Sequence, residues 1–227
     1  SDKIIFPSVI HASYMDTMGV YWLTSHSDGV IKCVSTNTSF KFSQNEVSST
    51  YSDKNEVLSM MEDDNQILWE ASNDGYVRLF DKHDKLVGYL SPTGKITSQG
   101  VRFGLVTAMT QSRDGTLWLG GENQLFSLER KGVGEYHITK CRSFEEEYEM
   151  TNSRIREILE DGKGRIWLAT EGAGLHLLQK QDNGYRFIHK ENLFSDNYPP
   201  IVDHTKTLYE DRNQNIWVGS SEGLIVF

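Results

Sequence analysis

The chain lacks any long apolar run. Its 227 residues include no stretch near the roughly 20 apolar residues that a helix needs to cross a bilayer. The first six residues, Ser-Asp-Lys-Ile-Ile-Phe, also lack the charged start and apolar centre of a signal peptide. Localisation therefore cannot be read from the N-terminal residues.

Basic residues are in the minority. Lys and Arg number 23 against 32 Asp and Glu, which gives a net charge of −9, and the acidic residues are scattered. Binding to phosphate backbones needs a basic stripe, and none is visible. The charge balance argues against a nucleic-acid partner and against an anionic membrane surface.

Cysteine is scarce, with Cys33 and Cys141 the only two. They fall in non-adjacent repeats, too far apart for the roughly 7 Å between Cα atoms that a disulfide allows. We therefore expect free, structural thiols.

Catalytic and metal-binding motifs are also missing. There is no Gly-x-Ser-x-Gly, no phosphate-binding Gly-x-x-x-x-Gly-Lys loop and no His-Glu-x-x-His, and the seven histidines share no metal-like spacing. The acidic runs 62–64 and 145–147 read as solvated turns and loops better than as cation sites. We expect no enzyme activity, no metal and no cofactor in this segment.

What the chain does have is a tryptophan period. Its only five tryptophans are spaced 47, 49, 49 and 50 residues apart, at Trp22, Trp69, Trp118, Trp167 and Trp217. A fixed period of this length is typical of an architecture built from one repeated supersecondary unit.

Other residues recur at fixed offsets from each Trp. An Asp lies six residues before it in four copies, and a Gly lies three before it in three copies; these are Asp16, Asp63, Asp161, Asp211, Gly19, Gly115 and Gly164. An Asp side chain that caps a tight turn, followed by a Gly with positive φ, predicts a hairpin. A second Gly, six or seven residues after Trp, predicts the next hairpin, at Gly29, Gly75, Gly174 and Gly223.

These turns divide each repeat into four short strands. In the fourth copy the expected strands are 155–159, 165–170, 175–178 and 185–189. Four antiparallel strands in about 50 residues make a β-propeller blade, so the fold predicted is all-β, a propeller of five repeats. Each Trp is assigned to packing between blades, because its mid-strand position disfavours the alternative of a glycan-stacking platform on the rim.

The chain ends bear on closure. Residues 3–6 read as a strand, and the count of one, sixteen and three strands makes five full blades. A closed five-bladed ring would remove the open sheet edge. The whole chain, 1–227, is thus expected to be a single propeller domain that closes into a ring, or a propeller fragment.

The fourth repeat carries a family resemblance. Its segment Asp161-Gly162-Lys163-Gly164-Arg165-Ile166-Trp167-Leu168-Ala169-Thr170 resembles the two-component regulator propeller repeat, and the third and fifth copies follow the same pattern around Trp118 and Trp217. The resemblance implies the sensor propeller of a bacterial hybrid histidine kinase. Because such propellers usually have seven blades, it also implies the alternative that the chain is a fragment of a seven-bladed propeller. It further implies a periplasmic or other extracytoplasmic location as a domain of an inner-membrane protein, with neighbouring propeller or linker domains in the same protein.

The same resemblance implies an oligosaccharide or another small molecule as the signal. We expect it on the face that carries the inter-blade loops 44–56, 91–104, 141–153 and 191–203 and the hairpins after each Trp strand. Aromatic, Arg and polar side chains there suit a sugar ring and its hydroxyls. The candidate ligand residues are Tyr51, Arg102, Phe103, Phe144, Tyr148, Arg154, Phe194, Tyr198, Asn73, Asp74, Asn123 and Glu171. Further polar partners on the hairpins are His26, Asp28, Glu122 and Glu222.

Other functions remain open. A non-catalytic interaction or dimerisation scaffold would show an apolar surface patch instead of a polar pocket. A five-bladed glycosidase or lectin is a minor alternative, and a glycosidase would need two carboxylates across a sugar ring, with Glu157 as one candidate.

Overall fold

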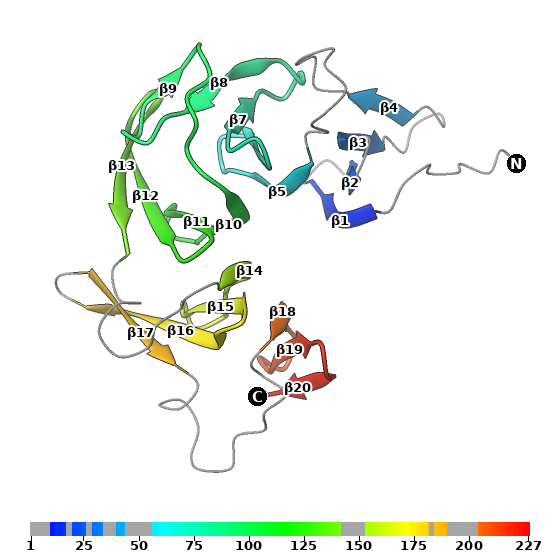
Figure 1. The fold of residues 1–227 in the computed structure, drawn as a ribbon, viewed down its shortest axis with the longest axis vertical. Helices are drawn as coiled ribbons and strands as arrows, with labels where there is room; N and C mark the ends of the chain where they lie inside the picture. Colours follow the sequence, from blue (N-terminus) through cyan, green and yellow to red (C-terminus); the bar gives the residue numbers. More distant parts are fainter. Residues whose placement is uncertain are drawn as a thin grey trace, which may run out of the picture. The chain divides into compact units, whose positions relative to one another are not determined.

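The computed structural model describes residues 10–16, 20–25, 29–33, 40–43, 56–141, 153–181, 184–189 and 204–227. Every regular element in these segments is a β-strand, and they hold no helix long and apolar enough to cross a bilayer. The strands form five antiparallel sheets (Figure 1), each with one Trp in its second strand. The chain is therefore an all-β protein made of propeller blades, as the tryptophan period predicts.

The described residues fall into two compact units. The first comprises Ser1–Leu90 and Thr97–Leu105 and holds two blades. Their strands are β1 (Ile10–Met15), β2 (Tyr21–Ser25), β3 (Gly29–Cys33), β4 (Phe40–Ser43), β5 (Val57–Glu62), β6 (Leu68–Ser72), β7 (Val77–Phe80) and β8 (Leu86–Leu90). The second blade also carries a short fifth strand, β9 (Ile96–Thr97), next to β8. The expected N-terminal strand at 3–6 lies outside the described residues.

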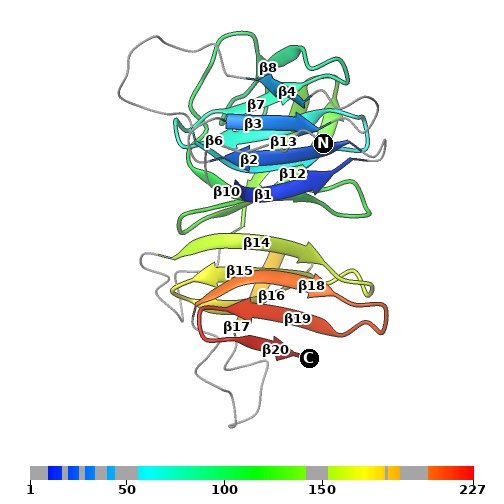
Figure 2. The same ribbon diagram turned by 90° about the vertical axis from the view of Figure 1, so that its right-hand side faces the viewer.

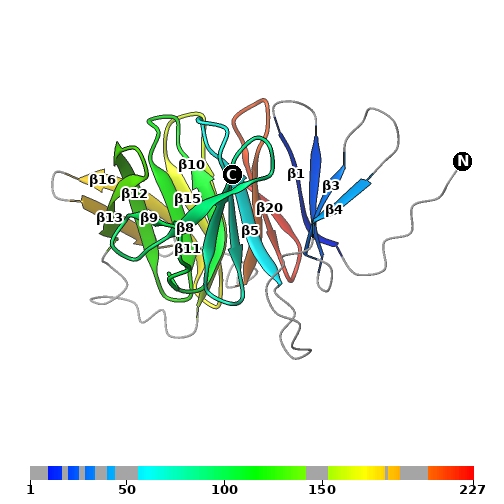
Figure 3. The same cartoon turned by 90° about the horizontal axis from the view of Figure 1, so that it is seen from above.

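The second unit comprises Ser91–Ile96 and Val106–Phe227 and holds three blades. Their strands are β10 (Val106–Gln111), β11 (Leu117–Gly121), β12 (Leu125–Gly132), β13 (Glu135–Lys140), β14 (Arg154–Glu160), β15 (Ile166–Glu171), β16 (Gly174–Gln181), β17 (Gly184–His189), β18 (Thr205–Glu210), β19 (Ile216–Ser220) and β20 (Leu224–Val226). The third blade can be followed in Figure 3 from β10 to β13, and Figure 2 shows the strands of the fourth and fifth blades side by side. The first strands β10, β14 and β18 lie next to one another in turn.

The segment 91–104, expected as a long loop, is partly ordered by pairing. Within the second unit, the turn before β9 pairs with β13, where Tyr136 N donates to Gly94 O at 2.7 Å and Ile96 N to Gly134 O at 2.8 Å. Gly94 has φ +84°, and a Cβ there would lie 1.9 Å from Tyr136 O. Residues 91–97 of the expected inter-blade loop are therefore fixed to a blade edge by backbone pairing.

The tryptophans fill the seams between blades. Trp118 packs in a buried cluster with Ile155 and Leu168 of the fourth blade, and Trp167 packs with Leu208 and Val218 of the fifth. In the first unit, Trp22 packs with Val57 of the second blade. The assignment of Trp to inter-blade packing is confirmed for these three residues.

Each indole is also held by its own blade. The residue six positions earlier accepts a hydrogen bond from Nε1 in every copy: Trp22 to Asp16 at 3.1 Å, Trp69 to Asp63 at 3.1 Å, Trp118 to Ser112 at 3.1 Å, Trp167 to Asp161 at 2.8 Å and Trp217 to Asp211 at 3.0 Å. In the third blade a serine hydroxyl replaces the carboxylate. Because Asp63 is 4% exposed, the interpretation of 62–64 as a solvated turn is wrong for that residue.

The same carboxylates cap the turns, as predicted. Asp161 Oδ1 accepts the backbone N–H groups of Lys163 and Arg165, both at 2.9 Å. Its Oδ2 accepts from the indole of Trp167 and from Arg165 Nε, the latter at 2.6 Å. One side chain thereby fixes both the turn and the tryptophan.

The glycine after each capping residue is needed less strictly than expected. Gly115 and Gly164 have φ +85° and +75°, as predicted for these turns. At the same offset the second and fifth blades place Gln66 and Gln214, with φ +60° and +65°. The turn geometry is therefore kept even where glycine is absent.

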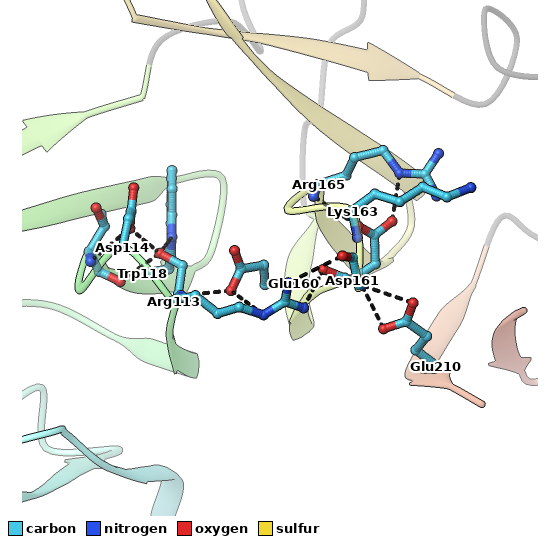
Figure 4. A network of polar contacts seen from close by, with 11 residues as sticks. Arg113, Asp114, Trp118, Glu160, Asp161, Lys163, Arg165 and Glu210 are labelled. Carbon is cyan, nitrogen blue, oxygen red and sulfur yellow. Dashed lines mark hydrogen bonds and ion pairs between the residues drawn. The ribbon is translucent and has the colours of Figure 1, made fainter. Parts of the chain in front are cut away.

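Two first strands, β14 and β18, end in a glutamate that reaches back to the preceding blade (Figure 4). Glu160 Oε2 accepts from Arg113 N at 2.7 Å, and Glu210 accepts from Gly162 N at 2.7 and 2.8 Å. Arg113 also donates to the carbonyl of Asp161 at 2.6 Å. These contacts join the three blades of the second unit at the turn ends of their first strands.

The buried thiol of Cys141 is free. Burial raises its pKa to about 11, so it is neutral at physiological pH. The expectation of a structural thiol is confirmed for Cys141, whereas the side chain of Cys33 lies outside the described residues.

Candidate functional site

A polar cavity of about 390 Å³ lies between the third and fourth blades. It opens at the end of β14 opposite to the glutamate contacts of Figure 4, since β14 runs from Arg154 to Glu160. Its lining residues come from the β11–β12 hairpin, from the start of β14 and from the end of β15: Glu122, Asn123, Ser153, Arg154, Arg156 and Glu171.

The β11–β12 hairpin is latched to the start of the fourth blade. Asn123 N donates to Ser153 O at 2.9 Å, and Ser153 N donates to Asn123 Oδ1 at 3.0 Å. Asn123 has φ +54°, a left-handed conformation that Asn adopts more readily than most residues. The latch fixes one wall of the cavity across the seam between blades.

Two ion pairs line the cavity. Arg154 Nη2 lies 2.6 Å from Glu122 Oε1 and crosses the seam, while Arg156 Nη2 contacts Glu171 Oε2 within the fourth blade. The arginine side chains are 35% and 38% exposed, and the glutamates 47% and 49%. The arginine side chains are therefore somewhat less exposed than the glutamate side chains.

A β-bulge places Arg156. Ile155 pairs with Thr170, and Glu157 pairs with Ala169. Thr170 and Ala169 are adjacent on β15, whereas Arg156 lies between their partners on β14, so Arg156 is the extra residue of the bulge. A bulge leaves its extra residue outside the ladder and redirects its side chain, and bulges are frequent next to functional sites. Arg156 can thus line the cavity together with Arg154.

Ser153 contributes a buried hydroxyl. The residue is 1% exposed, and its Oγ has no hydrogen-bond partner among the residues that the structure describes. A buried hydroxyl without a partner is destabilising, by about 1–3 kcal/mol. Such a group is a natural contact for a bound polar molecule.

The lining is suited to binding by hydrogen bonds and charge. Among the residues that the structure describes, no aromatic side chain, histidine or cysteine lines it. Within the described segments, no group of three or more His, Cys, Asp or Glu is placed to hold a metal ion. The arrangement can recognise a polar, hydroxyl-bearing or charged ligand.

The cavity brings together three of the predicted ligand residues, Asn123, Arg154 and Glu171, and the predicted hairpin partner Glu122. The sequence reasoning missed Ser153 and Arg156. The offset of Arg156, eleven residues before Trp, holds a different residue in each copy: His11, Leu58, Thr107, Arg156 and Lys206. That variability at a bulge position is the signal that could have found it.

Four other predicted residues lie in the first unit. Phe103 N donates to Gly75 O at 2.8 Å, so the segment with Arg102 and Phe103 folds onto the β6–β7 hairpin that carries Asn73 and Asp74. The remaining predicted residues lie outside the described segments: Tyr51, Phe144, Tyr148, Phe194 and Tyr198.

The β6–β7 hairpin encloses a buried ionic network. Arg78, 3% exposed, lies 3.5 Å from Glu70, contacts Asp74 and donates to Ser72 Oγ at 3.0 Å. Its guanidinium also lies 5.3 Å from the ring centre of Tyr76. Asp74 is therefore committed to Arg78, so this predicted ligand residue serves the hairpin itself.

Glu157, the candidate glycosidase carboxylate, lies on β14. Its Oε2 accepts from Leu208 N of the fifth blade at 2.6 Å, and burial raises its pKa. The carboxyl group thus links the first strands of two blades.

Solved structures with the same fold include two from B. thetaiotaomicron, each described as the extracellular domain of a hybrid two component system. BT3049 has a TM-score of 0.69 at 19% identity, covering 96% of this chain and 27% of its own. BT4673 has a TM-score of 0.74 at 14% identity, covering 100% of this chain and 28% of its own. The chain thus spans about a quarter of those domains.

The fold is shared with an enzyme as well. A virginiamycin B lyase from Staphylococcus aureus matches with a TM-score of 0.66 at 11% identity, over 97% of this chain and 70% of its own. No curated protein matches the chain in sequence. Likeness at these identities establishes the propeller fold and leaves the activity to be argued from the site.

A family match comes from the repeat itself. Residues 149–172, the start of the fourth blade, match the family described as "Two component regulator propeller". The match includes Asp161, Trp167 and the cavity residues Arg154, Arg156 and Glu171. The chain therefore carries a repeat of the two-component regulator propeller family, as the residues around Trp167 indicate.

Proposed function

We propose that this chain is the ligand-sensing part of a larger hybrid two-component signalling protein, that it acts outside the cytoplasmic membrane, and that its ligand is an oligosaccharide. The regulator propeller repeat and the fold shared with extracellular domains support the sensor role. The polar cavity between the third and fourth blades is the observation that carries the proposal. Membrane anchoring and kinase activity would belong to other domains of the same protein.

The cavity suits a sensor because it straddles a seam. A ligand there would contact the β11–β12 hairpin through Asn123 and the first strand of the next blade through Arg154. Binding shifts an equilibrium only if the ligand prefers one arrangement over another. A ligand that contacts two blades at once binds best at one separation between them. It therefore favours that arrangement of the blades over others.

A thermal-melt panel of defined oligosaccharides tests the proposal. Ligand at about 100 times its dissociation constant adds about 2.7 kcal/mol of stability. For a chain of this size that raises the Tm by about 5–11 °C. We expect the shift with one glycan class, its loss in Arg156→Gln, and its persistence in Glu222→Gln, a hairpin residue of the fifth blade outside the cavity.

Two results would count against the proposal. A cooperative melt with no shift for any oligosaccharide would argue against sugar sensing by this chain. A shift that Arg156→Gln and Asn123→Ala leave unchanged would place the ligand elsewhere on the molecule.

An interaction scaffold is the second candidate. The outer strand of the fifth blade, β20, exposes Leu224 by 60% and Val226 by 44%. Apolar side chains along a strand suit contact with another protein or a second copy of the chain. Analytical ultracentrifugation of the wild type and of Leu224→Lys tests self-association through this strand. If the strand forms a dimer contact, the wild type sediments as a dimer and the variant as a monomer.

A further inference from the structure

We infer that the cavity between the third and fourth blades binds a sugar that bears a carboxylate, with Arg154 and Arg156 holding that carboxylate. The inference rests on the proposed function, because it names the class of oligosaccharide for the same site. It follows from how the four charged side chains are arranged.

The two arginines present unused donors to one cavity. Each guanidinium has five N–H donors in a planar fork. Among the described residues, Arg154 and Arg156 each contact a carboxylate through a single nitrogen, Nη2. A fork that is engaged at one nitrogen can still bind a carboxylate through two parallel hydrogen bonds, the geometry for which arginine is best suited.

The partner carboxylates can give way. Glu122 and Glu171 are about half exposed, and exposed ion pairs contribute little to stability. A ligand carboxylate can therefore take the place of either glutamate on its arginine. The displaced glutamate turns toward solvent.

The lower exposure of the arginine side chains favours an anionic ligand. They are 35% and 38% exposed, against 47% and 49% for the glutamate side chains, so the glutamates are the freer partners in both ion pairs. When the glutamates swing outward, the cavity keeps two positive groups. An amino sugar would need the reverse arrangement, with carboxylates at depth.

The neutral part of the lining fits the rest of such a ligand. Ser153 brings a buried hydroxyl without a partner among the described residues, which a ligand hydroxyl could satisfy. The described residues that line the cavity include no aromatic side chain, so the lining that they form is suited to charged and hydroxyl groups rather than to ring stacking. Polar and charged groups must supply the specificity.

Matched ligand pairs test the inference on the whole chain. The probes are oligogalacturonides, alginate oligosaccharides and hyaluronan oligosaccharides, each beside its carboxyl-reduced neutral counterpart, with chitosan and sulfated oligosaccharides as further arms. By isothermal titration we expect at least one uronate probe to bind, its reduced counterpart to bind at least 100-fold more weakly, and added salt to weaken the uronate complex.

The cavity variants separate the roles of the two charges. Arg154→Gln and Arg156→Gln should each weaken uronate binding at least tenfold, whereas Arg212→Gln, an exposed arginine in a turn of the fifth blade, should not. Glu171→Gln should bind the uronate as tightly as the wild type or more tightly, because it removes the competitor for Arg156. Unliganded Tm values of all variants report whether the fold is intact.

The failure of this inference is distinct from that of the proposed function. If a neutral, sulfated or amino sugar binds and the uronates do not, the sensor remains and the carboxylate assignment is wrong. Weaker uronate binding in Glu171→Gln would also overturn it, since Glu171 would then contact the ligand as a required acceptor. If no saccharide of any arm binds, both proposals fail.

Discussion

At the scale of the residue, one acidic side chain joins the turn of a blade to its tryptophan. Asp161 is fully buried and accepts from two backbone N–H groups and from the indole of Trp167. Asp81, in the turn between β7 and β8, accepts the same two backbone bonds from His83 and Lys85 but has no tryptophan partner. The two residues form a natural matched pair.

Replacing each aspartate by alanine should separate the two roles. Asp161→Ala leaves the buried Trp167 N–H without its acceptor, which costs about 1–3 kcal/mol. We therefore expect the loss of unfolding free energy in Asp161→Ala to exceed that in Asp81→Ala by that amount, as measured by urea unfolding. Equal losses would mean that neither the indole bond nor the bond from Arg165 Nε adds to the turn.

The same aspartates should make the protein acid-sensitive. Hydrogen bonds from Trp217 and Asn215 lower the pKa of Asp211 from 3.8 to about 2. For Asp161, burial alone would raise the pKa, but the bonds from Trp167 and Arg165 outweigh it, so the pKa is lowered. A lowered folded-state pKa gives stability that is present above the unfolded value and is lost as the pH falls toward the folded value.

We therefore expect the unfolding free energy to fall between about pH 4 and pH 2. Denaturant unfolding at a series of pH values measures it. Asp211→Asn, which cannot titrate, should show a shallower fall over this range. A slope identical to that of the wild type would assign the acid sensitivity to other carboxyl groups.

At the scale of the element, the hairpin between the first two strands keeps one shape with different residues. Gly115 and Gln214 occupy the same offset before Trp, and both have positive φ. A Cβ on Gly115 would meet no atom within 4 Å, so only the backbone conformation opposes a side chain there. Gly115→Ala should therefore cost about 1 kcal/mol.

Gln214→Gly is the complementary change. Relief of the left-handed strain and the greater entropy of the unfolded glycine chain oppose each other, so we expect a change within about 0.5 kcal/mol. The midpoints of urea unfolding measure the stability of both variants, provided that the m-value stays the same. A large loss in Gln214→Gly would show that the glutamine side chain itself stabilises the turn.

At the scale of the whole molecule, the sequence predicts one propeller domain. If the five repeats unfold together, calorimetry should show a single transition with equal calorimetric and van 't Hoff enthalpies. The expected enthalpy near 60 °C is about 160 kcal/mol for 227 residues. Two transitions would instead indicate that Ser1–Leu90 and the segment from Val106 onward unfold independently.

Periodicity made the blades predictable from the sequence, and local exceptions limited the rest. The offsets of Asp161 and Trp167 predicted turns and strands because every blade has a capped turn and a packed tryptophan at these positions. The pairing of 91–97 was missed because it depends on a distant strand edge. Arg156 was missed because a bulge, which breaks the two-residue alternation, places it in the cavity.

The hydrogen bond between each indole and its own blade has a spectroscopic consequence. The emission of an indole responds to the polarity and charge around it, and each of these five rings is held within 3.1 Å of a named acceptor. Variants that retain only Trp118 or only Trp167 would each report optically on a single seam. Trp118 lies in the seam that also holds the cavity, but at the opposite, turn end of the blades (Figure 4), so its emission would report whether a change in the cavity is transmitted along the seam.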